Sequence, residues 1–273
     1  HVQEAFVRTI PGVENVAFVR YGYSIEHGVI YAEELKHGLE AKRVEGLFFA
    51  GQVNGTTGYE EAAAQGIVAG INAALRVQGK EPFMLRRDEA YTGVLIDDLI
   101  TRGTNEPYRM FTSRVEYRLL IREDNTDERL AHYGRRFGLI GDDEYRAVEE
   151  KYAQVRGLEE RLRGLSVVPA DINPVLEAVG SAPVAERAVL YDILKRPHVT
   201  WGHVARFDAG LAAASPAVAA RVAYDVKYAG FIAHQQKEVD RFRHLENIRI
   251  PAELDYAAIT AISYEVREKL RRF

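Results

Sequence analysis

A glycine-rich turn between an apolar strand and a long helix constrains the fold more than any other feature. Residues 47–50 (LFFA) are apolar on both faces, as in a strand that is buried from both sides. They lead directly into Gly51, and a helical pattern then runs from about Gly58 to Val77. Three glycines within eight residues allow positive φ angles and a close approach of the backbone to a ligand. We therefore predict a strand–turn–helix unit of an α/β sheet.

The start of this helix predicts an anion site. Thr57 and Glu60 have the spacing of a capping box, so the helix is expected to begin there. The unpaired N–H groups and the positive end of the helix dipole then point back at the turn. A tight turn that binds no ligand is the alternative, since the segment is neither a GxGxxG motif nor a P-loop.

Caps and apolar spacing predict a mainly helical second half. Helices are expected at residues 1–9, 58–77, 94–101, 126–137, 142–163 and 216–246, with others beginning at Asn173-Pro174 and at Asp255. Short strands are expected at residues 15–19, 46–50 and 116–121. The domain boundary is placed near Gly138–Gly141, after which the pattern is helical throughout.

Charge and composition exclude several classes of protein. The net charge of −4, from 36 basic and 40 acidic residues, excludes a nucleic-acid binder that relies on bulk positive charge. No apolar run reaches the roughly 18 residues of a membrane span. Cysteine is absent, and the eight histidines are scattered, so no disulfide, cysteine nucleophile or metal site is expected. These features fit a cytoplasmic protein.

A local cluster of arginines could still contact nucleic acid. Five arginines fall within 21 residues: Arg102, Arg109, Arg114, Arg118 and Arg122. Aromatic residues lie between them, and guanidinium groups bind phosphate while aromatic rings stack on unpaired bases. We predict nucleic-acid contacts through Arg102, Arg109, Arg114 and Arg118. Internal ion pairs with the neighbouring acids, Asp97 and Asp98 among them, are the alternative.

Another aromatic pattern follows the long C-terminal helix. Tyr224, Tyr228 and Phe231 are spaced i, i+4 and i+7, which places them on one helix face. Core packing is expected for this stripe, and a partner surface is the alternative.

Three segments resemble the MnmG (GidA) family, the FAD-dependent tRNA uridine 5-carboxymethylaminomethyl modification enzymes. Residues 50–66, AGQVNGTTGYEEAAAQG, closely match the second flavin-binding segment of that family. Residues 97–120, DDLITRGTNEPYRMFTSRVEYRLL, look like the family almost residue for residue. A looser match covers KYAGFI at 227–232, Gln235, Ile250-Pro251 and LDY at 254–256. The three matches occur in order and cover nearly the whole chain.

The resemblance implies a mixed α/β and α fold. Residues 1–80 would form the C-terminal part of a FAD-binding, Rossmann-like domain, and residues 81–140 an irregular arginine-rich segment packed on it. Residues 141–273 would form a helical C-terminal domain. Gln52 would contact the flavin or its ribityl chain. Its neighbours at the cofactor would be Gly51, Asn54, Thr57, Gly58, Tyr59 and Glu60.

The resemblance also implies a reaction and its partners. With the GTPase MnmE, the family adds a carboxymethylaminomethyl-type group at C5 of wobble uridine 34 of tRNA. FAD would carry the electron and one-carbon chemistry, with NADH and a folate as co-substrates, and the full-length protein would be a homodimer. The family's GxGxxG unit and cysteines have no counterpart here. The chain is therefore expected to be an inactive C-terminal fragment whose own end is truncated and whose catalytic residues are unknown.

Two alternatives are kept. One is a folate- and FAD-dependent tRNA uridine-54 methyltransferase of the TrmFO type, which shares the flavin scaffold but has no long helical C-terminus. The other is a non-catalytic helical module that binds tRNA or protein, in which residues 1–80 serve only for packing.

Overall fold

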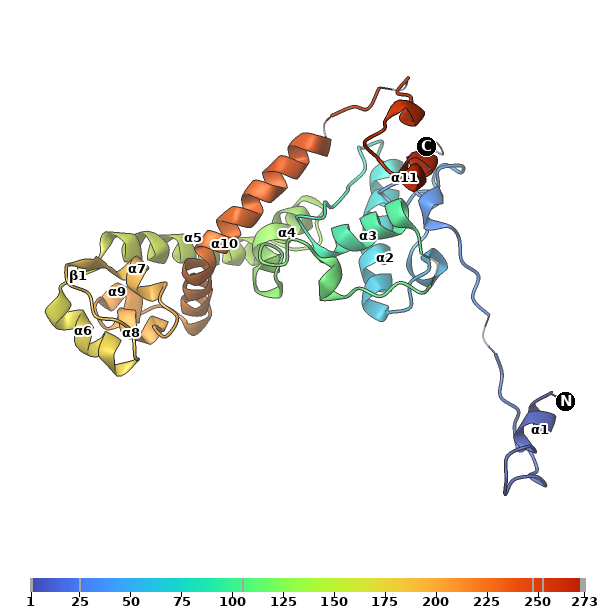
Figure 1. The fold of residues 1–273 in the computed structure, drawn as a ribbon, viewed down its shortest axis with the longest axis horizontal. Helices are drawn as coiled ribbons and strands as arrows, with labels where there is room; N and C mark the ends of the chain where they lie inside the picture. Colours follow the sequence, from blue (N-terminus) through green and yellow to red (C-terminus); the bar gives the residue numbers. More distant parts are fainter. Residues whose placement is uncertain (1, 25, 105, 247, 252, 271–273) are drawn as a thin grey trace. The chain divides into compact units, whose positions relative to one another are not determined.

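The computed structural model describes residues 2–24, 26–104, 106–246, 248–251 and 253–270. The chain forms two compact units, His1–Glu116 and Tyr117–Phe273, which are described separately (Figure 1). Within the described residues, the one sheet is a pair of two-residue antiparallel strands in the second unit. Helices build the rest of the regular structure.

The first unit is organised around two helices. Its α-helices are α1 (Val2–Val7), α2 (Tyr59–Val77) and α3 (Tyr91–Arg102), and its short 3₁₀ turns are η1 (Ala32–Glu34), η2 (Gly51–Asn54) and η3 (Thr112–Arg114). Helix α2 packs against α3 and η2 (Figure 1). Apolar side chains from α2, α3 and the loop at 35–41 form the core of this unit, among them Leu35, Leu39, Val68, Ile96 and Leu99. The turn at Gly51–Asn54 therefore lies against this core through the contact between η2 and α2.

The strands predicted at residues 15–19 and 46–50 are wrong. Residues 16–18 have no regular structure between a turn at Asn15 and a bend at Val19, and Val19 is fully exposed. Residues 47–50 are extended, but their pairing is limited to an isolated bridge between Glu40 and Phe48 and two adjacent backbone hydrogen bonds. A strand needs a ladder of such bonds. Within the described residues the segment at 39–41 supplies too short a partner.

The helix predicted after the glycine turn is confirmed, but its capping box is wrong. Helix α2 begins at Tyr59 with Gly58 as N-cap, and no side chain caps it. Thr57 therefore lies outside the helix, and Glu61, not Glu60, occupies the third helical position. Helix α3 ends at Gly103, whose φ of 63° suits glycine, as the sequence predicts.

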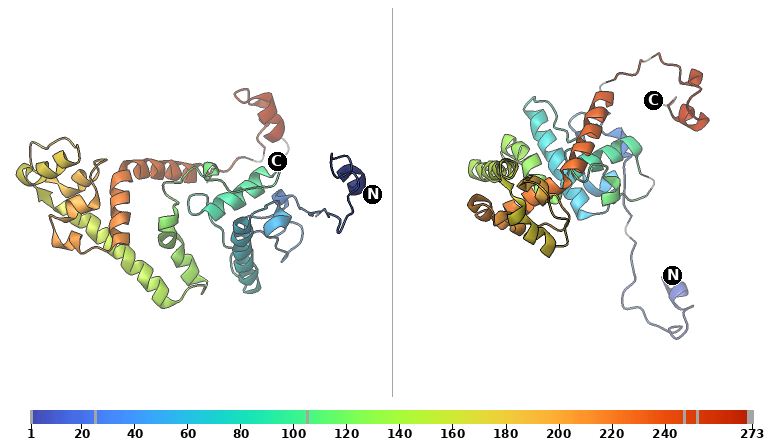
Figure 2. Two further views of the ribbon diagram at one scale, coloured as in Figure 1. Left: turned by 90° about the horizontal axis from the view of Figure 1, so that it is seen from below. Right: turned by 60° about the vertical axis from the view of Figure 1, so that its left-hand side comes forward.

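The second unit is a helical domain. It contains η4 (Glu123–Asn125), α4 (Thr126–Arg136), α5 (Asp142–Gly164), β1 (Ser166–Val167), α6 (Pro169–Ala178), β2 (Ala188–Val189), α7 (Leu190–Leu194), α8 (Trp201–Ala205), α9 (Ala209–Ala212), α10 (Pro216–Glu246), η5 (Tyr256–Ala258) and α11 (Tyr264–Leu270). Helix α5 packs against α4, α7 and α10, and Figure 2 shows α5 and α10 from two further directions. The predicted apolar stripe of α5 is confirmed, because Tyr152, Val155 and Leu162 are buried in the core.

Several local predictions in this unit are wrong. The predicted strand at residues 116–121 is a turn, in which the N–H groups of Leu120 and Ile121 both donate to the carbonyl of Tyr117. Asn173 does not begin a helix, because it lies within α6. Its side-chain amide forms two hydrogen bonds with the backbone of Val184. The Asn173 amide therefore joins α6 to the loop 11 residues later and does not cap a helix.

Asp255 caps a shorter element than expected. Its carboxylate accepts the N–H of Ala257 at 2.9 Å and so begins η5, whereas the last helix, α11, begins later at Tyr264. The predicted start of the long helix is confirmed at Pro216, where the Ser215 hydroxyl accepts the N–H of Val218 at 3.4 Å.

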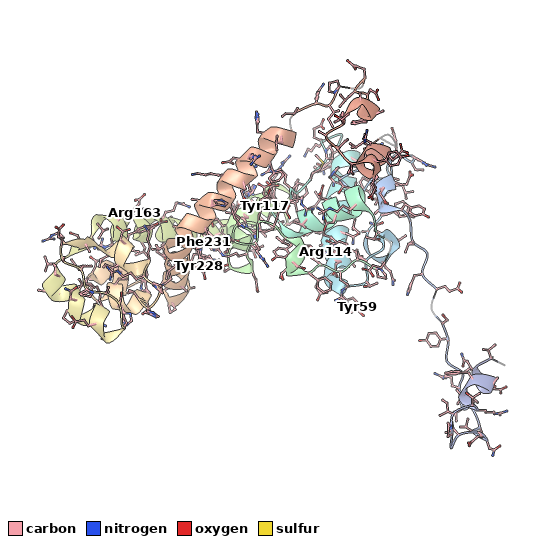
Figure 3. The ribbon with its side chains drawn as sticks, viewed as in Figure 1. Tyr59, Arg114, Tyr117, Arg163, Tyr228 and Phe231 are labelled. Atoms are coloured by element: carbon pink, nitrogen blue, oxygen red, sulfur yellow. The ribbon has the colours of Figure 1, made fainter. Side chains whose placement is uncertain are left out.

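The aromatic stripe of α10 lies largely at the surface. Tyr224 is half-buried, whereas Tyr228 and Phe231 are exposed (Figure 3). The rings of Tyr224 and Tyr228 stack with centroids 4.4 Å apart. The expected core packing is therefore wrong for Tyr228 and Phe231 within the described part of the chain.

The two compact units divide at a different place from the expected boundary near Gly138–Gly141. They divide after Glu116, because α4 packs against α5 and so groups residues 117–140 with the helical domain. The arginine-rich segment at 81–140 is consequently shared between the two units.

Candidate functional site

The glycine turn is built around one buried side chain, Gln65 of α2. The Gln65 Oε1 atom accepts the N–H of Gly51 at 3.2 Å and the Nδ2 of Asn54 at 2.8 Å. Its Nε2 donates to the hydroxyl of Thr56 and to the carbonyl of Glu61, both at 3.0 Å. Gln65 is 0% exposed, so these four bonds form away from water. The inside of the turn is therefore filled by the protein itself.

The predicted cofactor residues separate into two sets. Gln52, Thr57, Tyr59 and Glu60 are exposed, and Gly58 is half-buried; Tyr59 is labelled in Figure 3. Gly51 and Asn54 are buried behind the turn, and the N–H of Gly51 is used by Gln65.

Asn54 is a structural part of the turn. Its Nδ2 donates to the carbonyl of Phe49 at 2.9 Å as well as to Gln65. Because no side chain caps α2, the N–H groups of Tyr59 and Glu60 in its first turn stay open to an electron-rich group. The residues present therefore suit a ligand at the start of the helix, and do not suit one inside the turn.

The structure leaves no space for a side chain at Gly58 while Glu61 keeps its position. A Cβ atom at this position would lie 1.6 Å from the Oε2 of Glu61 and 2.6 Å from its Cδ. The Glu61 side chain is buried, so it has little freedom to move aside. The glycine thus lets the buried carboxylate lie directly beneath the N-cap.

Glu61 joins the turn to the arginine loop at 108–110. Its Oε1 accepts the N–H of Met110 at 2.8 Å and lies 3.6 Å from the Nε of Arg109. Burial raises the pKa of this carboxyl, but the hydrogen bonds from Met110 and from its own N–H, together with Arg109, outweigh burial and hold it below the ordinary value. The N–H of Tyr108 also donates to the carbonyl of Gly55 at 2.8 Å. The turn and the loop therefore form one connected piece.

A buried carboxylate, Asp98, organises the arginines of the first unit. It is 1% exposed and accepts the Nη1 of Arg87 at 2.7 Å and the hydroxyl of Tyr108 at 2.9 Å. Burial, followed by Asp98, raises the pKa of the Tyr108 hydroxyl well above its ordinary value. Arg102 and Arg114 reach the same carboxylate at 3.4 and 4.0 Å.

Arg87 is the main cation of this network. Its guanidinium donates to Glu116 at 2.6 Å and to Asp97 at 2.9 Å in addition to Asp98. These bonds, with Glu116 first, raise its pKa above the ordinary value. Arg102 and Arg114 share Asp98 with Arg87 at longer distances, and Arg109 lies near Glu61, so the internal ion pairs named as the alternative are present for these three arginines.

The side chains of the predicted nucleic-acid residues are exposed, except for that of Arg114, which is half-buried and donates through its Nε to the carbonyl of Arg109 at 3.0 Å. The side chains of Arg102, Arg109 and Arg114 are 66%, 55% and 36% exposed, and Arg114 lies 4.3 Å from the ring centroid of Tyr108 (Figure 3). Arg118 is exposed but belongs to the second unit. The structure therefore brings three of the four predicted arginines to one unit.

Arg122 differs from the other arginines. Its side chain is 10% exposed, pairs with Asp124 and Asp225 at 2.8 and 3.3 Å, and stacks over Tyr224 at 3.9 Å. It therefore holds the segment before α4 to α10.

Three buried polar residues of α2 were not predicted, and two of them, Glu61 and Gln65, build the site at the glycine turn. Glu61, Gln65 and Asn72 are buried on the helix face that also carries Val68 and Leu75. Their spacing of four and seven residues indicates a shared face. Polar residues in register with the apolar face of a helix are a signal that could have found them.

Two classes of site find no support in the described residues. Their His, Asp and Glu side chains form no group of three that could hold a metal ion. Nor does any helix among them have the length and apolarity needed to cross a bilayer.

Three family models match the sequence. "Glucose inhibited division protein A" matches residues 1–81, the "tRNA modifying enzyme MnmG/GidA C-terminal helical domain" matches 142–236, and the corresponding "C-terminal helical bundle" matches 238–273. The chain belongs to the MnmG/GidA family. The two C-terminal helical matches favour this family over the uridine-54 methyltransferase alternative, for which no long helical C-terminus is expected.

Relatives named as MnmG enzymes agree with these matches. The chain is 48% identical to the tRNA uridine 5-carboxymethylaminomethyl modification enzyme MnmG of Geobacter sulfurreducens, over 100% of this chain and 44% of that protein. It is 47% identical to the MnmG of Christiangramia forsetii, over 99% of this chain and 44% of that protein. The chain therefore spans less than half the length of these MnmG relatives.

A solved MnmG/GidA structure shares the fold. The structure of Aquifex aeolicus GidA in its form II crystal matches with a TM-score of 0.74 and 42% identity, over 99% of this chain and 43% of that one. Membership of the family accounts for a partial Rossmann-like region followed by a helical domain.

Proposed function

We propose that this chain is part of a FAD-dependent enzyme that, with the GTPase MnmE, adds a carboxymethylaminomethyl-type group at C5 of wobble uridine 34 of tRNA in the cytoplasm. In this proposal NADH and a folate are co-substrates, and the full-length protein is a homodimer. The chain by itself supplies part of the cofactor site and part of the tRNA surface. Its family membership supports the reaction class.

One observation supports the assignment of both surfaces to this chain. The open start of α2 and the exposed arginine loop belong to one connected piece, joined through Glu61–Met110 and Gly55–Tyr108. A cofactor at the helix start would thus lie on the same rigid support as Arg109. An enzyme that acts on a base in RNA needs this proximity of cofactor and phosphate-binding groups.

The exposed residues of the turn have separate roles in the proposal. Gln52 and Thr57 offer polar groups to the flavin end of the cofactor, and the N–H groups at Tyr59 and Glu60 face its electron-rich part. FAD, when bound, would supply the electron and one-carbon chemistry. Asn54 and Gly51 act behind the turn and do not contact the cofactor.

The tRNA surface is tested by salt-dependent binding. Alanine variants of Arg102, Arg109, Arg114 and Arg118 should each lower the salt slope of tRNA binding by about one, because each removes one phosphate contact. Arg20→Ala, at an exposed position remote in sequence, is the matched control. If all four variants bind with the affinity and slope of the control, these arginines are not the tRNA surface.

The cofactor turn is tested by a pair of glycine substitutions in the full-length flavoprotein. Gly58→Ala should lower its FAD content, because the new methyl group must displace Glu61 beneath the helix start. Gly70→Ala in the same helix meets no atom within 4 Å and should leave the FAD content unchanged. Equal FAD content in both variants would contradict the assignment of the turn to the cofactor.

A further inference from the structure

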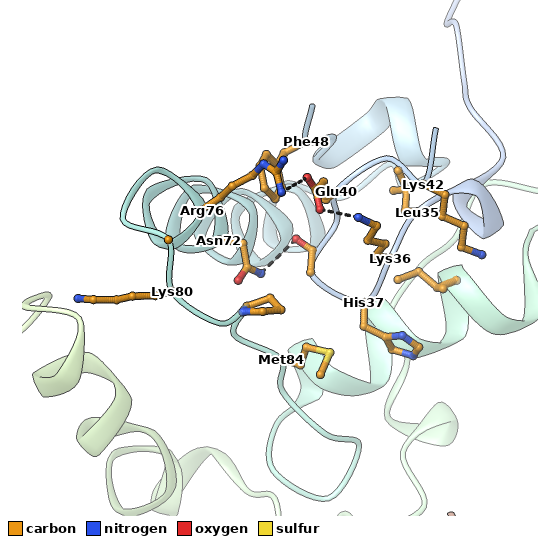
Figure 4. A pocket seen from close by; sticks show the side chains of 14 residues that line it. Leu35, Lys36, His37, Glu40, Lys42, Phe48, Asn72, Arg76, Lys80 and Met84 are labelled. Atoms are coloured by element: carbon orange, nitrogen blue, oxygen red, sulfur yellow. Dashed lines mark hydrogen bonds and ion pairs between the residues drawn. The ribbon is translucent and has the colours of Figure 1, made fainter. Parts of the chain in front are cut away.

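A second pocket lies at the other end of α2 from the glycine turn (Figure 4). It has a volume of about 510 Å³, within the range of sites for small organic molecules. Leu35, Phe48, Pro82, Met84 and Ile100 give it an apolar floor. Asn72 and Arg76, the α2 residues that line it, lie 13 and 17 residues after Tyr59, which is roughly 20–25 Å along the helix at about 1.5 Å per residue. None of the predicted cofactor residues lines this pocket, although Phe48 lies three residues before Gly51.

The walls of the pocket are held in place by Asn72, which is 2% exposed. Its Nδ2 donates to the carbonyl of Gly38 at 3.1 Å and to that of Phe83 at 2.8 Å, and its Oδ1 accepts the N–H of Phe83. A Cβ on Gly38 would lie 2.9 Å from the Asn72 amide nitrogen. One buried amide thus fixes two walls, so the pocket exists before a ligand arrives.

The lining of the pocket is positively charged. Four Lys or Arg side chains and one carboxylate, Glu40, line it among the described residues. Lys36 and Arg76 share that carboxylate at 2.9 and 3.1 Å, whereas Lys42 and Lys80 form no ion pair with it. The lining side chains alone therefore sum to +3, not counting His37. Arg76 also pairs with Glu45 outside the pocket at 2.8 Å, and the Lys42 ammonium donates to the carbonyl of Glu33 at 2.6 Å. Among the described residues, Lys80 makes neither kind of contact.

His37 lies at the edge of the pocket beside an acidic side chain. Its Nε2 lies 3.6 Å from Asp97, and this interaction raises the pKa of the imidazole above its ordinary value. Cationic side chains beside an apolar floor are complementary to a molecule that has an apolar body and an anionic group.

We propose that this pocket binds an organic anion whose body is apolar, with the body on the Leu35–Phe48–Met84 floor and the anionic group at Lys80. An inorganic anion would leave the apolar floor uncovered. A neutral apolar molecule would leave the cations uncompensated. The site is independent of the cofactor turn and of the tRNA surface, so its test can fail while the proposed function stands.

The first experiment compares three probes on the full-length protein. The anionic dye 8-anilinonaphthalene-1-sulfonate has both parts, its neutral analogue N-phenyl-1-naphthylamine has only the apolar body, and sodium sulfate has only the charge. Fluorescence titration should show the anionic dye binding about tenfold more tightly than the neutral analogue. Sulfate at matched ionic strength should compete weakly. Equal affinities of the two dyes would overturn the proposal.

The second experiment locates the bound dye with matched variants. Lys80→Glu should weaken binding of the anionic dye about fivefold relative to Lys237→Glu, an exposed lysine on α10. Met84→Trp should fill the pocket and weaken binding of both dyes relative to Ile67→Trp, which lies on α2 outside the pocket. Circular dichroism checks folding, and Lys80→Glu, at an exposed position, decides if Met84→Trp does not fold. Unchanged affinity in Lys80→Glu would overturn the proposal.

Discussion

Replacing Glu61 with alanine should loosen the connection between the glycine turn and the arginine loop. The Glu61 carboxylate is 4% exposed, accepts the N–H of Met110 at 2.8 Å and lies 3.6 Å from Arg109. Glu60 precedes it in the same helical turn but is exposed, so Glu60→Ala is a matched control. Both changes remove one acidic side chain from the start of α2.

The size of the effect follows from what each variant loses. Without Glu61, the half-buried N–H of Met110 lacks its acceptor, which costs about 1–3 kcal/mol. The pair with the half-exposed Arg109 adds no more than about 1 kcal/mol. Changes in helix propensity and in the interaction with the helix dipole are common to Glu61→Ala and Glu60→Ala and so cancel. The free energies of unfolding of the two variants should therefore differ by about 2 kcal/mol.

Urea unfolding measures this difference. With a slope of about 1–2 kcal/mol per molar urea, the transition of the first unit, followed by far-UV circular dichroism, should shift about 1–2 M lower in Glu61→Ala than in Glu60→Ala. Trp201, the one tryptophan, belongs to the second unit, so its fluorescence transition should be the same in both variants. Hydrogen exchange at Met110 should also be faster in Glu61→Ala. Equal midpoints, or a shift in the Trp201 transition instead, would refute this reasoning.

Three further predictions concern stability. Arg87→Met should destabilise the first unit by about 3 kcal/mol in urea unfolding, because it leaves Asp98 buried without its closest cation; no change would contradict the network. Gln65→Leu should cost about 2–4 kcal/mol, since it strands the buried groups that Gln65 pairs; a neutral result would mean that the turn does not depend on them. The hydrogen bond from Arg161 lowers the pKa of Asp208 from 3.8 to about 2, so this pair should stabilise the second unit above pH 4 and lose that effect as the pH falls through 2. Acid unfolding of Asp208→Asn should lack this dependence, and an unchanged acid transition would contradict it.

The long helices were predictable because their signals are local. Helix α5 shows its apolar stripe in its own spacing, and α10 begins where a serine precedes a proline. The strand at 46–50 was not predictable in the same way, because strand formation depends on a partner elsewhere in the chain. Its apolar character suggests burial, which the structure provides only in part: Phe48, Phe49 and Ala50 are half-buried against the core of the first unit, and Leu47 is exposed.

The candidate site also combines local features, which the sequence shows, with contacts between distant residues, which it does not show. The glycines of the turn are visible in the sequence because Gly51 and Gly55 adopt positive φ angles that other residues rarely adopt. The filling of the turn by Gln65 was not foreseen, since a polar residue in an alanine-rich helix is usually placed at the surface. Arg87 was missed because it lies before the arginine cluster and reaches Asp98 and Glu116 only through the folding of the loop.

The glutamine inside the glycine turn has a consequence for how tightly and for how long a ligand can bind. A loop that closes on a ligand must give up conformational freedom at that moment, and the affinity falls by that amount. Here the four bonds of Gln65 impose the same restriction during folding. A molecule that meets the start of α2 therefore encounters a preorganised rim, and its residence time depends on the contacts it makes there and not on loop closure.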